Sequence, residues 1–191
     1  MKMKSNHSVF SASQSLQDQW APQSICFGCG PANQQGLKIK SFVSNSKQDL
    51  PSPLLLQSHL SQSSDHPIAQ CRWHAQNHHQ AFPGMLSGGI IGTLLDCHSN
   101  WTAAWHLWWQ KGEGNRDSQI PCTVTALYSV ELLKPTPSHL EITLLAQAQE
   151  TTERKAVIHA ELFAGDEKCA TCRGTFVTVK PGHPAYHRWT P

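Results

Sequence analysis

Hydrophobic and polar residues follow two different periods along this chain, and each period predicts a kind of element. Residues 36–43 alternate between apolar and polar, which is typical of a strand, and residues 68–75 form a second such stretch. Between about Gly88 and Trp109 the apolar residues recur at helical spacing and cover much of the circumference. A helix of that kind is expected to be enclosed by a sheet.

The second half of the chain reads as strands. Its β-branched and apolar residues gather in four stretches, 123–133, 140–149, 155–164 and 170–179. The last three are separated by short polar turns, which favours antiparallel hairpins. The order of elements therefore predicts an α+β fold, in which a curved antiparallel sheet wraps around one long central helix.

The remaining stretches lack a period. Residues 1–20 are rich in Ser and Gln and are expected to form a disordered or loosely docked tail. Residues 44–66 resemble them and are interpreted as a surface insertion between two strands. One domain is predicted over residues 25–181, followed by a second tail at 182–191.

Composition narrows the class of protein. Only 15% of the 191 residues are charged and the formal net charge is +2, without the basic tract of a nucleic-acid-binding protein. No apolar run is long enough to cross a membrane. The residues after Met1 are polar, so no signal peptide is expected, and the seven cysteines are interpreted as reduced thiols of a cytoplasmic protein.

Residues 82–96 carry the strongest chemical signal. A Pro-Gly turn leads to Ser87, two glycines and the start of the helix. Ser87 is expected to cap that helix, whose first N–H groups would point at a bound group. Asp96 interrupts the apolar surface further along. A polarising helix start and a carboxylate are suited to attack on a carbonyl, although a structural Asp96 bonded to Ser99 or Asn100 is the alternative.

Three motifs together resemble the hot-dog-fold acyl-CoA thioesterases of the phenylacetate type. They are Cys-Phe-Gly-Cys-Gly-Pro-Ala-Asn at 26–33 followed by Gly36-Leu37, the segment 82–96, and Val-Glu-Leu-Leu-Lys-Pro-Thr-Pro at 130–137. The resemblance implies a hot-dog fold that needs no cofactor. It also implies a homodimer or a dimer of dimers, with acyl-CoA bound in active sites at the subunit interface.

The same resemblance implies roles for individual residues. Asp96 falls on the position of the catalytic carboxylate, either as general base on a water or as nucleophile. Gly88 falls where a helix-start N–H polarises the thioester carbonyl. Thr125 falls where a hydroxyl from the partner subunit holds the water in some members.

Four further residues are candidates for substrate binding, namely Ser87, Gly89, Gln80 and Arg173. Ser87 stands where the family has His, and Ala81 where Asn is frequent, with the Gln80 amide next to it. These departures support an alternative, a hot-dog protein that binds acyl thioesters without efficient hydrolysis. Arg173 near the last strand could meet CoA phosphates or be ordinary surface charge.

The cysteines offer a third hypothesis, a zinc-stapled structural module. Cys26-x-x-Cys29 and Cys169-x-x-Cys172 are two pairs with the spacing of zinc ligands. The pairs lie roughly 140 residues apart, and the second falls on a predicted strand, where an offset of three points side chains to opposite faces. Buried thiols and no bound metal are therefore expected.

Overall fold

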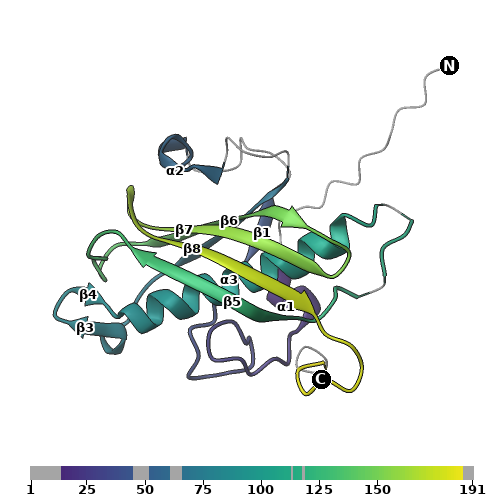
Figure 1. The fold of residues 1–191 in the computed structure, drawn as a ribbon. Coiled ribbons are helices and arrows are strands. Elements are labelled where there is room, and N and C mark those ends of the chain that lie inside the picture. The colour runs from purple at the N-terminus through teal and green to yellow at the C-terminus, as the bar shows by residue number, and fades with distance from the viewer. Residues whose placement is uncertain (1–13, 45–51, 61–65, 113, 118, 187–191) are drawn as a thin grey trace.

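One antiparallel sheet and one long helix make up most of the molecule (Figure 1). The computed structural model describes residues 14–44, 52–60, 66–112, 114–117 and 119–186. The strands of the six-stranded sheet are, in spatial order, β1 (Phe42–Ser44), β2 (Ile68–Trp73), β6 (Ile142–Thr151), β7 (Lys155–Ala164), β8 (Glu167–Thr178) and β5 (Thr123–Leu132). A short hairpin joins β3 (Gln80–Phe82) to β4 (Met85–Leu86), next to the 3-10 helix η3 (Asn77–His79).

The central helix α3 spans Gly88–Trp109, as its apolar spacing predicts. It packs against β5, β6, β7 and β8. Trp101, Trp105 and Trp108 of α3 are buried in this core. The sheet wraps around the helix, so the predicted α+β hot-dog arrangement is confirmed.

The predicted strand at 36–43 is mostly not a strand. Only its end pairs in the sheet, as part of β1. The preceding backbone bonds to the cysteine turn instead, because Leu37 N–H donates to the Phe27 carbonyl (2.7 Å) and Ile39 N–H to the Gly28 carbonyl (3.1 Å). The alternating pattern is real, but these N–H groups already have partners outside any sheet.

The predicted N-terminal tail is partly wrong, because helix α1 (Leu16–Trp20) is docked on α3. Leu16 is buried, and the rings of Trp20 and Trp108 meet edge to face at 5.5 Å. Residues 1–13 lie outside the described residues.

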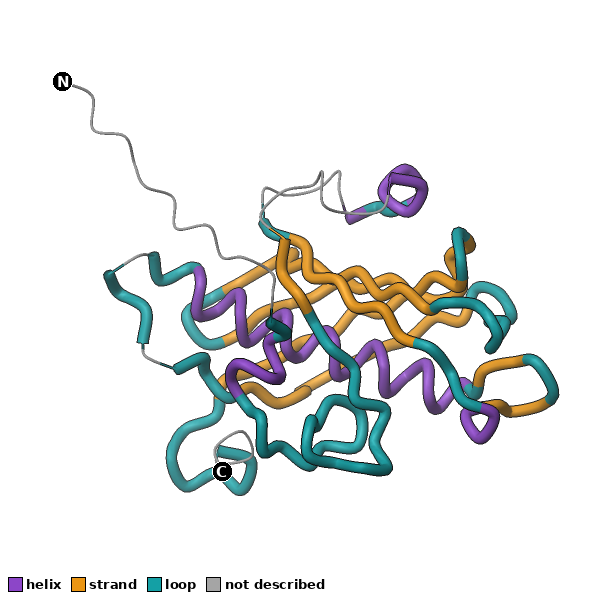
Figure 2. The backbone as a smooth tube through the Cα atoms, turned by 180° about the vertical axis from the view of Figure 1, so that it is seen from behind, coloured by secondary structure: helices purple, strands orange, loops and turns teal. Residues whose placement is uncertain are grey.

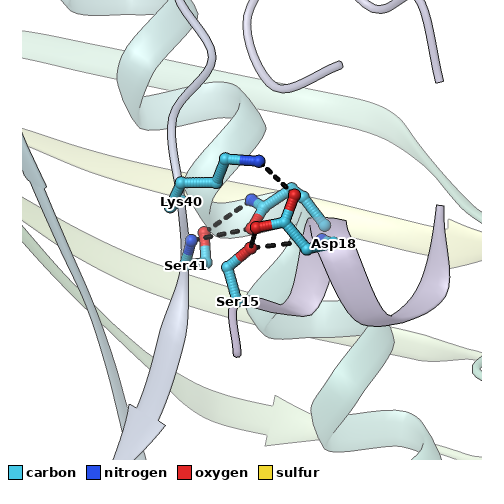
Figure 3. Close-up of polar contacts among 5 residues, drawn as sticks. Ser15, Asp18, Lys40 and Ser41 are labelled. Atoms are coloured by element: carbon cyan, nitrogen blue, oxygen red, sulfur yellow. Dashed lines mark hydrogen bonds and ion pairs between the residues drawn. The ribbon is translucent and has the colours of Figure 1, made fainter. Parts of the chain in front are cut away.

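Polar contacts tie α1 to the segment that leads into β1 (Figure 3). Ser15 caps the helix by accepting from Asp18 N–H, and Lys40 pairs with Asp18. The fully buried Gln17 donates to Ser41 Oγ (2.9 Å) and accepts from Ser41 N–H (2.7 Å). The Ser/Gln-rich composition suggested disorder, but here a Ser and a Gln satisfy buried backbone and side-chain groups.

The insertion between β1 and β2 covers the outer face of the sheet. Helix α2 (Ser52–Gln57) and the residues after it bring Leu54 and Leu60 against Leu145 and Phe163. The fully buried Glu161 beneath them accepts hydrogen bonds from Ser58 and Lys168. Residues 45–51 and 61–65 of this segment, and 187–191 of the predicted C-terminal tail, lie outside the described residues. Among the helices that the structure describes, none is both long and apolar enough to span a bilayer.

We predict that Gln17→Met lowers the free energy of unfolding by about 1–3 kcal/mol, because it leaves the buried Ser41 N–H and hydroxyl without this amide partner at nearly constant volume. Urea unfolding followed by circular dichroism measures the change. The exposed neighbour provides the control, since Gln19→Met changes the same residue type in the same helix. Equal effects of the two substitutions would contradict the docking of α1.

Candidate functional site

A cavity of about 400 Å³ lies between the cysteine turn and the middle of α3. Its lining residues are Ser24, Ile25, Cys26, Cys29, Asp96, Cys97, Asn100 and Trp101. Asp96 is the only residue with a carboxylate side chain among these lining residues, and no Lys or Arg is among them. The cavity therefore combines mostly apolar walls with one acidic group, an arrangement suited to a small-molecule site.

A chain of hydrogen bonds positions the Asp96 carboxylate. Thr125 Oγ1 donates to Asp96 Oδ1 at 2.7 Å. Thr125 Oγ1 in turn accepts from Asn100 Nδ2 (3.5 Å), and Asn100 Oδ1 accepts from Thr123 Oγ1 (2.6 Å). Thr123 and Thr125 are two residues apart on β5, so both side chains face α3. These hydrogen bonds orient the Thr125 hydroxyl as a donor to Asp96.

The Thr125–Asp96 bond lies within one chain, whereas the resemblance implied a hydroxyl supplied by the partner subunit. Thr125 bonds to Asp96 of its own chain because β5 runs beside α3 within one protomer. The donor to Asp96 Oδ1 is Thr125.

Tyr128 is a neighbour of Asp96 that no pattern in the sequence indicated. Its hydroxyl lies over Gly92, where a Cβ would approach it to 2.6 Å, so that position suits glycine. The pKa of Tyr128 is raised, first by partial burial and then by the negative charge of Asp96. The sequence signal was the glycine one turn before Asp96, but nothing in the sequence indicates which strand residue covers it.

The start of α3 lies away from the cavity. Ser87 occupies the N-cap position with extended backbone angles (φ −65°, ψ 135°), yet its side chain makes no capping hydrogen bond, so that prediction is wrong. Its Oγ lies 3.8 Å from where a Cβ of Gly89 would stand, without hydrogen-bond geometry to a first-turn N–H. Gly88 and Gly89 are exposed. The N–H groups of a first helical turn have no acceptors within the helix, so this end is suited to bind a carbonyl oxygen.

Within one chain, Gly88 and Asp96 lie about two turns apart along α3. They are eight residues apart on a continuous helix, which corresponds to about 12 Å of axial rise. A carbonyl held by a hydrogen bond at its oxygen and attacked directly at its carbon bridges roughly 7 Å, and a water between the carboxylate and that carbon adds about 3 Å. The axial rise between the two residues is larger than either span, before the reach of the Asp96 side chain is counted.

Two predicted substrate-binding residues have other partners. Gln80 Oε1 accepts from Gly84 N–H at 3.0 Å, which closes the turn of the β3–β4 hairpin. Arg173 is exposed on β8 and pairs with Glu150 at 3.0 Å. Its neighbour Cys172 belongs to the core against α3, and alternate residues of a strand face opposite sides. Arg173 therefore lies on the outer face of the sheet, away from Asp96.

Three cysteines converge at the cavity. The Sγ atoms of Cys26, Cys29 and Cys97 all lie within 4.8 Å of one another. The two Cys-x-x-Cys pairs are not brought together in this way, because Cys169 and Cys172 lie on β8, where the Cys169 thiol contacts the Pro135 carbonyl (3.6 Å). Cys97 was missed because it has no partner at a ligand spacing in the sequence.

Contacts within the cluster shift the pKa values of its thiols in opposite directions. The pKa of Cys26 is held far below its usual range, first by side-chain hydrogen bonding with Cys29 and Cys97, and also by the N–H groups of Cys29 and Gly28. The same interaction raises the pKa of Cys29 to about 12 and raises that of Cys97 well above its usual value.

Comparisons with known proteins agree on the fold. No family model and no curated protein matches this chain. A solved thioesterase superfamily protein is 18% identical with a TM-score of 0.53, and the match covers 90% of this chain and 70% of that one. A thioesterase superfamily protein from Shewanella loihica is 28% identical (TM-score 0.49, 59% of this chain and 84% of that one). The E. coli PaaI protein from the phenylacetic acid degradation operon is 17% identical (TM-score 0.48, 59% and 73%).

The match over most of the chain fits the architecture described above, in which one antiparallel sheet encloses a single long helix. At this level of identity the likeness concerns the backbone and not the chemistry. The chain therefore has the hot-dog fold of the thioesterase superfamily protein that matches 90% of it.

Proposed function

We propose that this protein hydrolyses an acyl thioester, with acyl-CoA as the substrate class. The observation that carries the proposal is the Asp96 carboxylate at a mostly apolar cavity, oriented by the Thr125 hydroxyl in a hot-dog fold. The sequence motifs around Asp96 and the helix start support the same chemistry. The alternative, binding without efficient hydrolysis, is a distinct outcome of the assay below.

In the proposed reaction, Asp96 takes a proton from a water whose oxygen adds to the thioester carbonyl carbon. The carbonyl oxygen gains negative charge, which a helix-start N–H at Gly88 stabilises. The carbon–sulfur bond then breaks, the thiolate leaves and takes a proton, and the products are a carboxylic acid and a thiol. Direct attack by Asp96, followed by hydrolysis of the anhydride, gives the same products.

The cavity favours an uncharged acyl group. Ile25 and Trp101 contribute apolar walls, and Asn100 and Asp96 are the polar groups on the α3 side. No cationic side chain lines it to bind a second carboxylate. A volume of about 400 Å³ falls in the range of small-molecule sites.

We further propose that the active unit is a homodimer, because the rigid helix separates Gly88 from Asp96. A second chain related by a twofold axis can supply its helix start to the Asp96 of the first. The edge strand β5 is suited to such pairing, since Leu127, Leu132 and the adjacent Leu133 are exposed there. Exposed edges of this kind tend to be paired or covered.

Release of free thiol from a panel of short, aromatic and long acyl-CoAs tests the function. We expect Asp96→Asn to lower kcat by about 100-fold or more with the fold retained, because Asn cannot take a proton. Thr125→Val should lower kcat by about 10-fold without a matching change in KM, since it removes one hydrogen bond to the carboxylate. Thr171→Val on β8 is the control. Full activity of a folded Asp96→Asn protein would refute the assignment, and binding without thiol release by the wild type would favour the alternative.

Gly88 allows a test of its N–H alone. Proline suits the first position of a helix and lacks the N–H, and the extended Ser87 before it is compatible with a following proline. A Cβ at this position meets only the Leu132 side chain, at 3.6 Å. We expect Gly88→Pro to lower kcat by about 100-fold and Gly88→Ala, which keeps the N–H, to remain close to wild type. Equal activity of the two variants would remove Gly88 from the mechanism.

Mixing two inactive variants tests which chain supplies each group. If Gly88 acts on the Asp96 of the partner, a heterodimer of Gly88→Pro and Asp96→Asn chains has one intact site, and an equal mixture recovers about a quarter of wild-type activity. Asp96→Asn mixed with Thr125→Ala should recover little beyond the activity that the Thr125→Ala chain retains alone, because Thr125 bonds to Asp96 of the same chain. The opposite pattern, after confirmed subunit exchange, would overturn the arrangement.

A further inference from the structure

We propose that Cys26, Cys29 and Cys97 bind one zinc ion, whose fourth coordination position opens into the cavity that Asp96 lines. The two Cys-x-x-Cys pairs of the sequence do not form this site. It combines the first pair with a cysteine of α3 instead, and it replaces the sequence-based expectation of a metal-free protein.

The sulfur positions fit a tetrahedral ion. Two sulfurs bound at about 2.3 Å to a tetrahedral zinc lie about 3.8 Å apart. The Sγ atoms of Cys26 and Cys97 are 3.8 Å apart, and all three Sγ atoms lie within 4.8 Å of one another. Small side-chain adjustments would therefore place all three at bonding distance from one ion.

The turn that carries Cys26 and Cys29 is shaped to meet α3. Gly30 N–H donates to the Cys26 carbonyl at 2.9 Å and closes the turn. A Cβ on Gly28 would lie 2.4 Å from Cys97 Sγ, and one on Gly30 would lie 2.4 Å from Cys26 N. Only glycine fits at these two positions. The sequence of the turn thus allows the first cysteine pair to approach the cysteine on the helix.

A buried donor supports the sulfurs from outside the cluster. Trp101 Nε1–H donates to Cys29 Sγ at 3.2 Å, and the Trp101 side chain is only 1% exposed. Groups that ligate a metal are commonly held by hydrogen bonds of this kind, and a metal-bound thiolate is a good acceptor for an N–H. The indole thus orients one of the three proposed ligands.

The donor set selects a soft or borderline ion. Three thiols favour zinc over magnesium or calcium, which prefer oxygen ligands. Asp96 lines the same cavity but is not part of the group of atoms within 4.8 Å, so water or a bound molecule would complete the tetrahedron. Three protein ligands and an open position are typical of zinc sites that accept exogenous ligands. The ion would also fasten the turn, one wall of the cavity, to α3.

Metal content of the intact chain, purified under reducing conditions with a tag that lacks histidine, tests the site. We expect about one zinc per chain after dialysis. Cys26→Ser and Cys97→Ser should each lose that zinc, whereas Cys172→Ser, which removes a buried thiol outside the cluster, should keep it. The protein stripped of metal and loaded with Co²⁺ should show the intense visible absorption of tetrahedral cobalt–thiolate sites, and the Cys97→Ser protein should not.

The proposal does not depend on thioester hydrolysis, since metal content and cobalt spectra are measured without substrate. A reduced wild-type chain that takes up no stoichiometric zinc or cobalt would overturn it, as would zinc retained by both cluster variants. So would a disulfide within the cluster in protein whose thiols were blocked at cell lysis. If Cys97→Ser fails to fold, the wild-type protein is alkylated with and without a chelator. Removal of the metal by the chelator should increase alkylation of Cys26, Cys29 and Cys97, and equal labelling under the two conditions would refute the site.

Discussion

The burial of most of α3 is the constraint on which this structure depends. A helix of 22 residues with apolar side chains around its circumference must be covered on every side. The sheet covers one side, and α1 together with the segment from the cysteine turn to β1 covers much of the other, as the view from behind shows (Figure 2). The N-terminal residues are therefore ordered where α3 requires a cover, although their composition resembles that of a tail.

Burial of the helix also decides what its polar residues do. A buried polar group costs free energy unless it is hydrogen-bonded, and several polar residues of α3 have their partners on other elements. Asn100 and Asp96 find Thr123 and Thr125 on β5. His98 bonds to Ser41 at 2.9 Å, and its pKa falls to about 4 because burial disfavours the charged ring. The same requirement that holds the fold together thus orients the candidate catalytic carboxylate.

The rigidity of α3 has a consequence for chemistry. A helix start and a carboxylate on one continuous helix keep a fixed separation, here about 12 Å of axial rise. In the proposed dimer the helix start of one chain acts beside Asp96 of the other, and the edge strand β5 supplies a surface for that pairing. The turn that carries Cys26 and Cys29 contacts α3 at Cys97, next to Asp96, and forms one wall of the cavity.

Much of the fold could be predicted from the sequence because periodicity reports burial directly. The limits of α3 and of β7 are those that the apolar spacing indicated. Asp96 could be recognised because a charge within an apolar helix is costly without a role or a partner. The short β3–β4 hairpin and the helix α1 were missed, since a few residues carry no measurable period.

What only the tertiary structure decided is which residues meet. Thr125 bonds to Asp96 of its own chain because β5 lies along α3, and Arg173 faces away because of its place in the alternation of β8. Cys26 and Cys29 cluster with Cys97. They do not cluster with Cys169 and Cys172, although that pair has the same spacing in the sequence. Spacing along the chain records only local geometry. Contacts between residues 29 to 71 positions apart depend on how the helix, the sheet and the N-terminal turn pack together, and no local pattern encodes that packing.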